Sequence, residues 1–370
     1  MIPVNLPNIS EDDAQAVYRT VADGWISGEA AVVSDFEEAF ASYHGKRFGV
    51  AVPNGSLALD LVFNELGLGP GDEVILPSFA IISCVSEILR RGATPVFVDS
   101  DLSTWNMDVT AVESLVTERT RAILVVHIYG LPVDMDPLIA ISERFSIPII
   151  EDAAEAHGLI YKDRVCGSMG FASTFSFYAN KNVTAGEGGM IISDDEEFIQ
   201  RLRYLRNLAF SPQKRFVHEE IGWNLRFTGI QAALGLSQLD RLEETIDRRR
   251  SIASTYREAL HGIAGASMAP AQTPTGLNDY WVVGVTLDPD YYVSAEQVAK
   301  RLLKREIQTR PFFFPLHKQP VYIRSEVFRN YSLPVAEYLG DYGLYLPNGL
   351  GLTQDLIDRA AAAVREVLST

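Results

Sequence analysis

TFSFYANKNVTAGEGGM, at residues 174–190, is the stretch on which the expected fold and chemistry of this chain depend. Residues 174–178 alternate and are rich in aromatic side chains, the pattern of a buried strand, and a glycine-rich loop follows at 186–189. The strand is expected to end at Lys181. Because burial disfavours the ammonium form, an amine at the mouth of an apolar site can attack a carbonyl and form a Schiff base near neutral pH. A solvated surface lysine is the ordinary alternative, so residues elsewhere have to support the assignment.

Apolar runs and helical stretches alternate along the chain before this stretch. Continuous apolar strands separated by helices predict βαβ units, and therefore an α/β fold with a mostly parallel sheet covered on both faces. Ligands of such sheets lie at the carboxyl ends of the strands. The expected strands are FGVAVP, EVILP, TPVFVD, AILVVHIYG and IPIIED, and the expected helices start at Ser56 and cover 79–91, about 109–117 and 137–145.

One strand end of interest is Pro53-Asn54-Gly55-Ser56, which leads directly into an apolar helix. Free N–H groups at a helix N-terminus, together with a glycine and a serine hydroxyl, can bind one phosphate. Asn-Gly-Ser is also a common start of a helix, so a purely structural N-cap is the alternative.

A second strand end is IIEDAAEAH at 149–157, where an apolar strand runs directly into acidic residues. A buried carboxylate needs a cation or hydrogen-bond donors. Asp152 can therefore pair with an arginine, or it can hold the protonated ring nitrogen of pyridoxal phosphate. His157 is interpreted as a structural histidine.

Length and composition favour a soluble globular enzyme or binding protein. The chain has 370 residues, of which 47% are hydrophobic and 22% charged, and its net charge is −16. The length favours two unequal domains. The negative charge argues against nucleic acid or an anionic membrane surface as a partner, although clustered Arg, Lys and backbone N–H groups can still bind a small anion.

Cysteine usage and the N-terminal sequence predict a cytoplasmic protein. Cys84 and Cys166 form neither a disulfide framework nor the spacing of metal ligands, so no metal site is expected. The first residues lack the basic and apolar regions of a signal peptide, and no apolar run is long enough to span a membrane.

The rest of the chain predicts one large and one small domain. A short acidic helix is expected over 11–22, and a loop at 221–227 precedes one long helix that runs to about residue 260. We expect residues 1–250 to form the large cofactor-binding domain and residues 251–370 to form a smaller C-terminal α+β domain.

A phosphate-binding turn, an acid at a strand end and a lysine after a later strand, in this order on a parallel sheet, are what a pyridoxal-phosphate enzyme needs. The sequence also resembles the DegT/DnrJ/EryC1/StrS family of sugar-nucleotide aminotransferases, which has the aspartate-aminotransferase-like fold (PLP fold type I). Within the family it is most similar to the GDP-perosamine synthases. The matching stretches cover nearly the whole chain and include WIS at 25–27, NGSLAL at 54–59, EDAAEAHG at 151–158, TFSFYANKNVTAGEGGM at 174–190, GWNLRFTGIQAALGLSQLDRL at 222–242 and RPFFFPLH at 310–317.

The resemblance implies a role for each residue that matches a family motif. Lys181 would form the internal aldimine and shuttle the proton, Asp152 would bind the pyridine nitrogen, and Glu155 would lie near the phenolic oxygen. The family forms a homodimer with shared active sites, so the phosphate would be held by Gly55, Ser56 and Ser176 of one subunit and by Asn224 of the other. The residues expected on the substrate side are Trp25, Ser27, Arg226, Phe314 and His317.

Three positions depart from the family pattern. Many relatives place an aromatic residue over the pyridine ring where this chain has Ile81, and Phe79 is the residue expected to compensate. Perosamine synthases have His at the position of Phe314 and Tyr at the position of Leu225, and both changes fall on the side expected to bind the sugar nucleotide.

The resemblance implies an amino transfer from L-glutamate, by way of pyridoxamine phosphate, to C4 of an NDP-4-keto-6-deoxyhexose. GDP-4-keto-6-deoxymannose is the first choice of substrate, with GDP-perosamine as the product. The alternatives are a dTDP- or UDP-linked ketosugar aminated at C4 or C3, a 3-dehydratase with the same cofactor, and a regulatory or scaffold protein without turnover. Lys181 argues against the dehydratase, in which the family has histidine, and the intact set of cofactor residues argues against the scaffold.

Overall fold

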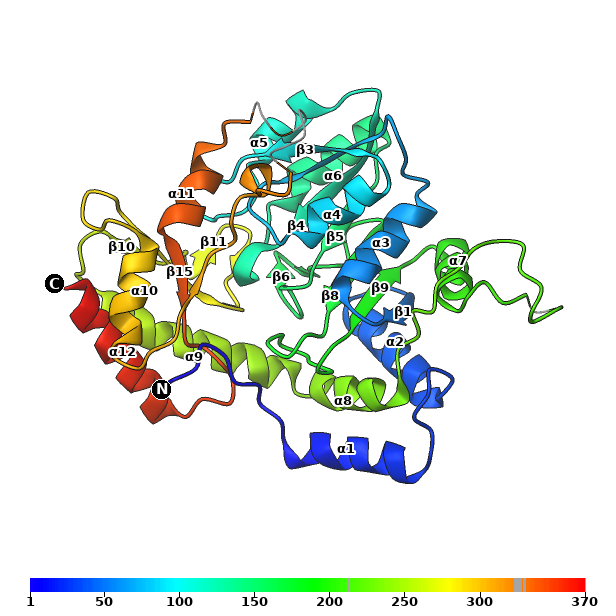
Figure 1. The fold of residues 1–370 in the computed structure, drawn as a ribbon, viewed down its shortest axis with the longest axis horizontal. Coiled ribbons are helices and arrows are strands. Elements are labelled where there is room, and N and C mark those ends of the chain that lie inside the picture. Colours follow the sequence, from blue (N-terminus) through cyan, green and yellow to red (C-terminus); the bar gives the residue numbers. More distant parts are fainter. Residues whose placement is uncertain (212, 323–327, 329–330, 370) are drawn as a thin grey trace.

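A computed structural model describes residues 1–211, 213–322, 328 and 331–369 of the chain (Figure 1). Its larger part is built on a seven-stranded sheet in the order β1-β9-β8-β5-β4-β2-β3. Strand β9 runs antiparallel to its neighbours β1 and β8, and the remaining neighbours are parallel, which confirms the predicted α/β class. The strands are β1 Phe48–Val52, β2 Glu73–Pro77, β3 Thr94–Val98, β4 Thr120–Val126, β5 Ile149–Asp152, β8 Ala172–Ser176 and β9 Gly189–Ser193.

Helices cover both faces of this sheet, and strand β4 shows how its residues are shared between them. Ala122, Leu124 and Val126 pack into one hydrophobic core, whereas Ile123 and Val125 pack into the other. Successive side chains of a strand point to opposite faces, so a doubly covered strand requires an unbroken apolar run. The first core includes α3 Gly55–Glu65, α4 Ser83–Arg90 and α7 Glu196–Arg206, and the second includes α2 Ala31–Tyr43, α5 Val109–Val112 and α6 Met135–Phe145.

The N-terminal helix α1 Glu11–Ala22 has the extent expected from the sequence. Ser10 and Asp13 form a capping box at its start. The Asp13 carboxylate also accepts hydrogen bonds from Ser237 Oγ at 2.7 Å and Gln238 Nε2 at 2.6 Å. Asp13 therefore fixes α1 against helix α8 Gly229–Leu239, which lies beside it in Figure 1.

The expected single long helix up to residue 260 is wrong, because two helices occupy this region. Helix α8 ends at Leu239, and α9 Leu242–Leu260 begins after Arg241, whose ψ of 17° departs from helical geometry. Helix α9 runs from the large sheet toward the C-terminal part (Figure 1). The predicted domain boundary at residue 250 falls inside α9, and the division of the chain there remains a prediction.

The C-terminal part is an antiparallel sheet covered by helices. The sheet has the order β10-β13-β15-β14, and residue Ile2 forms a bridge with Ile307 beside it. The strands are β10 Ala266–Ser267, β13 Val283–Leu287, β14 Arg310–Pro311 and β15 Gly343–Leu346, and the helices are α10 Ala295–Leu303, α11 Pro334–Tyr342 and α12 Gln354–Leu368. Two short hairpins complete the fold: β6 Ile160–Tyr161 with β7 Arg164–Val165, and β11 Gln272–Thr273 with β12 Gly276–Leu277. Within the described ranges, no helix has both the length and the hydropathy needed to cross a membrane.

Candidate active site

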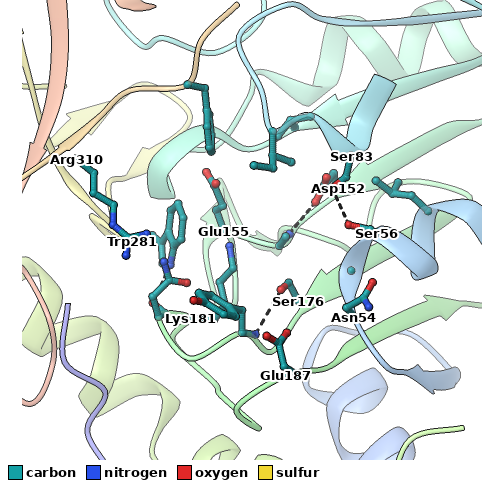
Figure 2. A pocket seen from close by; sticks show the side chains of 18 of the residues that line it. Asn54, Ser56, Ser83, Asp152, Glu155, Ser176, Lys181, Glu187, Trp281 and Arg310 are labelled. Atoms are coloured by element: carbon teal, nitrogen blue, oxygen red, sulfur yellow. Dashed lines mark hydrogen bonds between the residues drawn. The ribbon is translucent and has the colours of Figure 1, made fainter. Parts of the chain in front are cut away.

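A cavity of about 320 Å³ lies where strands β4, β5 and β8 reach their carboxyl ends, beside the start of helix α3 (Figure 2). This is the expected position for a ligand on a parallel sheet. Its polar lining residues are Asn54, Gly55, Ser56, Ser83, Asp152, Glu155, Ser176, Tyr178, Asn180, Lys181, Glu187, Arg310 and Tyr345. Six of the seven residues predicted to act on the cofactor therefore line one cavity: Gly55, Ser56, Asp152, Glu155, Ser176 and Lys181.

Lys181 reaches this cavity from a loop, and the prediction that the strand extends to it is wrong. Strand β8 ends at Ser176. The carbonyl of Phe177 accepts hydrogen bonds from Ala185 N–H at 3.0 Å and Thr184 Oγ1 at 3.1 Å, so the chain folds back on itself there. Lys181 is only 9% exposed. Burial lowers the pKa of its amine, while the nearby carboxylates oppose this change, and the result favours a nucleophilic amine near neutral pH.

Asp152 ends strand β5 with its carboxylate directed into the cavity (Figure 2). Its Oδ1 accepts a hydrogen bond from Ala154 N–H at 3.1 Å, and its Oδ2 accepts one from the Cys84 thiol at 3.3 Å. The residue is 4% exposed and forms no ion pair with any described arginine or lysine, which removes the alternative of a structural arginine partner in this part of the chain. Burial raises the pKa of Asp152, and the two hydrogen bonds oppose the rise. An unpaired buried carboxylate fits the protonated ring nitrogen of pyridoxal phosphate.

The start of helix α3 provides the expected cradle for a phosphate. The same segment also acts as the N-cap considered as the alternative, because Asn54 Oδ1 accepts a hydrogen bond from Leu57 N–H at 2.9 Å. A Cβ at Gly55 would lie 3.2 Å from the Cβ of Ser176, so glycine allows β8 and the helix start to approach closely. Ser56 Oγ lies 2.7 Å from Ser83 Oγ. Hydroxyls, free N–H groups and the positive end of the helix dipole thus meet at one corner of the cavity.

Glu155 faces the same space as Lys181 (Figure 2). Its Oε2 accepts a hydrogen bond from Tyr129 N–H at 2.8 Å. Burial raises the pKa of Glu155 to about 7, although Lys181 and the Tyr129 N–H lower it in part. A carboxyl group that titrates near neutral pH beside the lysine can exchange a proton during a reaction.

Six predicted site residues lie outside the cavity of their own chain, and four of them belong to residues 25–27 and 224–226. Asn224 is exposed and forms a bridge with Asn207, and Arg226 Nη1 donates to Asn207 Oδ1 at 2.8 Å. Trp25 is 65% exposed, and Ser27 is exposed as well. None of the four lines the cavity, so their predicted roles require a second chain and remain predictions.

The segment 310–317 contributes to the cavity differently from the expectation. Phe313 lines the cavity, whereas Phe314 does not. His317 is buried away from it, with Nδ1 2.7 Å from Ser78 Oγ and Nε2 3.1 Å from Glu337 Oε1. Burial lowers the pKa of His317, and Glu337 opposes this shift.

Aromatic contact with a ring in the cavity does not come from Phe79. Phe79 is fully buried and packs against Tyr129, Phe312 and Phe313, so it does not replace an aromatic residue at Ile81. Ile81 itself lines the cavity.

Besides Phe313, three lining residues from the C-terminal part were not predicted from the sequence: Trp281, Arg310 and Tyr345. They precede or belong to strands β13, β14 and β15, more than 100 residues after Asp152. Of the three, only Arg310 lies in a stretch that matches a family motif, RPFFFPLH at 310–317.

Comparisons with known proteins agree with this geometry. Residues 7–365 match the model of the DegT/DnrJ/EryC1/StrS aminotransferase family. The chain is 39% identical to the GDP-perosamine synthase of Caulobacter vibrioides, over 99% of this chain and 98% of that protein. Its structure is similar to the aminotransferase TlmJ from Streptoalloteichus hindustanus, with a TM-score of 0.92, 30% identity and coverage of 100% and 99% of the two chains. It is also similar to DesI, solved with its TDP-sugar product, with a TM-score of 0.89, 32% identity and coverage of 100% and 93%.

Proposed function

The chain belongs to the DegT/DnrJ/EryC1/StrS aminotransferase family, and from this premise we propose that it aminates C4 of GDP-4-keto-6-deoxymannose with L-glutamate as the donor. It is a sugar aminotransferase whose cofactor is pyridoxal phosphate. The observation that carries the proposal is that Lys181 and the unpaired carboxylate of Asp152 face one cavity. Similarity to a GDP-perosamine synthase along nearly the whole chain supports the choice of GDP and of C4.

Asp152, Gly55, Ser56 and Ser176 are the residues that would hold the cofactor. Asp152 would keep the ring nitrogen protonated, and the corner at the start of α3 would bind the phosphate. When bound, the cofactor supplies an electron sink for the carbon that loses or gains a proton. The task of the chain is to orient the reacting groups and to move that proton.

Lys181 Nζ is placed to carry the proton. Burial lowers the pKa of this amine, which favours the neutral form that can accept a proton. Glu155, with a pKa of about 7, lies across the cavity and can take up or return a proton as Nζ changes state. Lys181 and Glu155 are 9% and 7% exposed, so little bulk water reaches either group.

Arg310 supports a donor that carries a carboxylate. Within the part of the chain that the structure describes, it and Lys181 are the two cationic residues that line the cavity. No described carboxylate forms an ion pair with Arg310. Its side chain forms a hydrogen bond with the side chain of Tyr345 instead. A guanidinium without an acidic partner suits the planar carboxylate of an amino acid such as glutamate.

The choice of substrate is tested with a panel of GDP-, dTDP- and UDP-4-ketosugars, each incubated with the enzyme and glutamate. We expect kcat/KM for the GDP-linked sugar to exceed those for the others by about tenfold or more, because a site built to bond one base leaves its groups unpaired with another. Mass spectrometry and NMR of the products distinguish amination at C4 from amination at C3. Preference for dTDP or UDP would select the alternative substrates, and loss of the 3-hydroxyl without amination would select the dehydratase.

We also propose that two chains share each active site. The surface around Asn224 supports this arrangement, because Trp25, Phe216 and Ile221 are 65%, 79% and 91% exposed. Exposed aromatic and aliphatic side chains of this kind are enriched at interfaces, and two-fold dimers use such a patch twice. Asn224 would complete the phosphate site of the partner.

Complementation tests the shared site. Lys181→Ala and Asn224→Ala chains, each inactive alone, are mixed under conditions that exchange subunits. Mixed dimers carry both lesions in one site and none in the other, so activity should return to about a quarter of wild type at most. If subunit exchange is verified and activity does not return, Asn224 serves its own chain or has no part in the site.

A further inference from the structure

Trp281 lies against the amine of Lys181 inside the cavity (Figure 2). Lys181 Nζ is 3.8 Å from the centroid of the indole ring. Among the described residues, no carboxylate lies within ion-pair distance of Nζ, and no hydrogen bond to it is formed. The aromatic face is therefore the immediate partner of the reactive nitrogen.

This contact distinguishes the two protonation states of the lysine. An ammonium group is attracted to the face of an aromatic ring, most strongly to that of tryptophan, and the attraction is greatest where water is excluded. A neutral amine has no such attraction. Trp281 is 5% exposed, so the contact is made in a dry environment in which burial alone would favour the neutral amine.

The backbone that presents Trp281 is held in a strained conformation. Tyr280 has φ of 51°, which is rare for a bulky residue. Two asparagines stabilise it: Asn278 Oδ1 accepts from Tyr280 N–H at 2.7 Å, and Asn348 Nδ2 donates to Trp281 O at 2.9 Å. Strain persists where the surroundings fix it, and it commonly marks functional positions.

The indole nitrogen fixes the lysine loop as well. Trp281 Nε1–H donates to the carbonyl of Asn180 at 3.0 Å, one residue before Lys181. Arg249 Nη2 donates to the same carbonyl at 2.8 Å. Trp281 thus contacts the lysine loop twice: its ring contacts the Lys181 side chain, and its N–H binds the main chain at Asn180.

We propose that Trp281 is a catalytic residue whose indole face stabilises the amine of Lys181 in its protonated state, after the amine has accepted the proton and before it returns it, while the indole N–H keeps the lysine loop in place. The inference rests on the proposed transamination, for which the amine of Lys181 has to be free to move a proton. Trp281 then fixes the position of the free lysine, and its ring favours the ammonium form that Nζ has between accepting the proton and returning it.

Other charges also face Lys181, and a test must leave them unchanged. Burial lowers the pKa of the Lys181 amine, Glu155 and Asp152 raise it, and Arg249 lowers it. The neighbouring His157 has a pKa far below its usual range because it is buried, so it adds no positive charge near neutral pH. Substitution of Trp281 leaves each of these titratable groups in place, and water that enters the vacated space would raise the pKa of the amine, opposite to the change expected from loss of the ring.

The test measures how readily Lys181 reacts with acetic anhydride in the pyridoxamine-phosphate form, in which the lysine amine is free. Only the neutral amine reacts, so the pH midpoint of labelling, followed by mass spectrometry, reports its protonation. Trp281→Leu removes both the ring and the N–H, whereas Trp281→Phe keeps a weaker ring. Lys162, an exposed lysine whose Nζ lies 5.2 Å from the Tyr161 ring centroid, is the control in the same sample.

We expect the midpoint for Lys181 to fall by about one pH unit in the Leu variant and by less in the Phe variant, with Lys162 unchanged. The midpoint is decisive because wider access to reagent would raise the rate at every pH without moving it. An unchanged or raised midpoint in either variant, or an equal fall in both, would overturn the proposal. Absorbance of bound pyridoxamine phosphate is recorded first, so a failure to bind the cofactor is recognised separately and would contradict the assigned function instead.

Discussion

Lys181→Ala is expected to reduce steady-state turnover to below about one per cent of wild type, since loss of a proton-transfer residue typically costs 10²–10⁴-fold. No other lysine of the described residues lines the cavity, so none of them offers a second amine at that place. The variant should still bind pyridoxal phosphate, because Asp152 and the start of α3 are unchanged. Its absorbance band should lose the shift that a covalent bond to the lysine produces.

The matched control is Lys162→Ala. Lys162 is exposed, forms an ion pair with Asp136 and lies outside the cavity, so its removal should leave turnover unchanged. Turnover above one per cent in the Lys181 variant would contradict the assignment of this residue.

Asp152→Asn should preserve the fold and slow the reaction by about 10²–10³-fold, the cost of removing one charge-stabilising group from a buried site. A neutral amide is nearly the same size as the carboxylate but no longer favours the protonated ring nitrogen, so the cofactor becomes a poorer electron sink. Single-turnover kinetics with glutamate alone measure the effect on the first half-reaction, without any dependence on the sugar.

Asp60→Asn serves as the control for this substitution. Asp60 is also a buried acid, but it pairs with Arg91 and does not line the cavity. Its loss should lower the melting temperature and leave the rate of the first half-reaction near wild type. If Asp152→Asn behaved in the same way, Asp152 would have only a structural role.

The fold could be predicted because its strands are covered on both faces. In a strand such as β4, the residues that face one side of the sheet and those that face the other side must all be apolar. The result is an unbroken apolar run that is visible in the sequence. The end of β8 was misplaced because Phe177 and Tyr178 continue the alternation. The strand ends where the Phe177 carbonyl bonds within its own loop, which no local pattern reveals.

The site could be predicted only in part. Asp152 ends a strand, and Gly55 and Lys181 follow one, so the parallel sheet brings the three to one edge. Trp281 and Tyr345 reach that edge from the C-terminal sheet, and the packing of this sheet against the large one is a tertiary property. Pattern and spacing describe neighbours along the chain, and they contain no information on this approach.

The main chain and the side chain of Asn180 have separate roles. Trp281 and Arg249 hold the lysine loop through a backbone oxygen, which every amino acid possesses. The side chain of Asn180 lines the cavity, and its Oδ1 is buried without a hydrogen-bond partner in the described part of the protein. A substitution at position 180 should therefore keep both bonds to the backbone oxygen, and with them the position of Lys181, while it changes a polar group that lines the cavity.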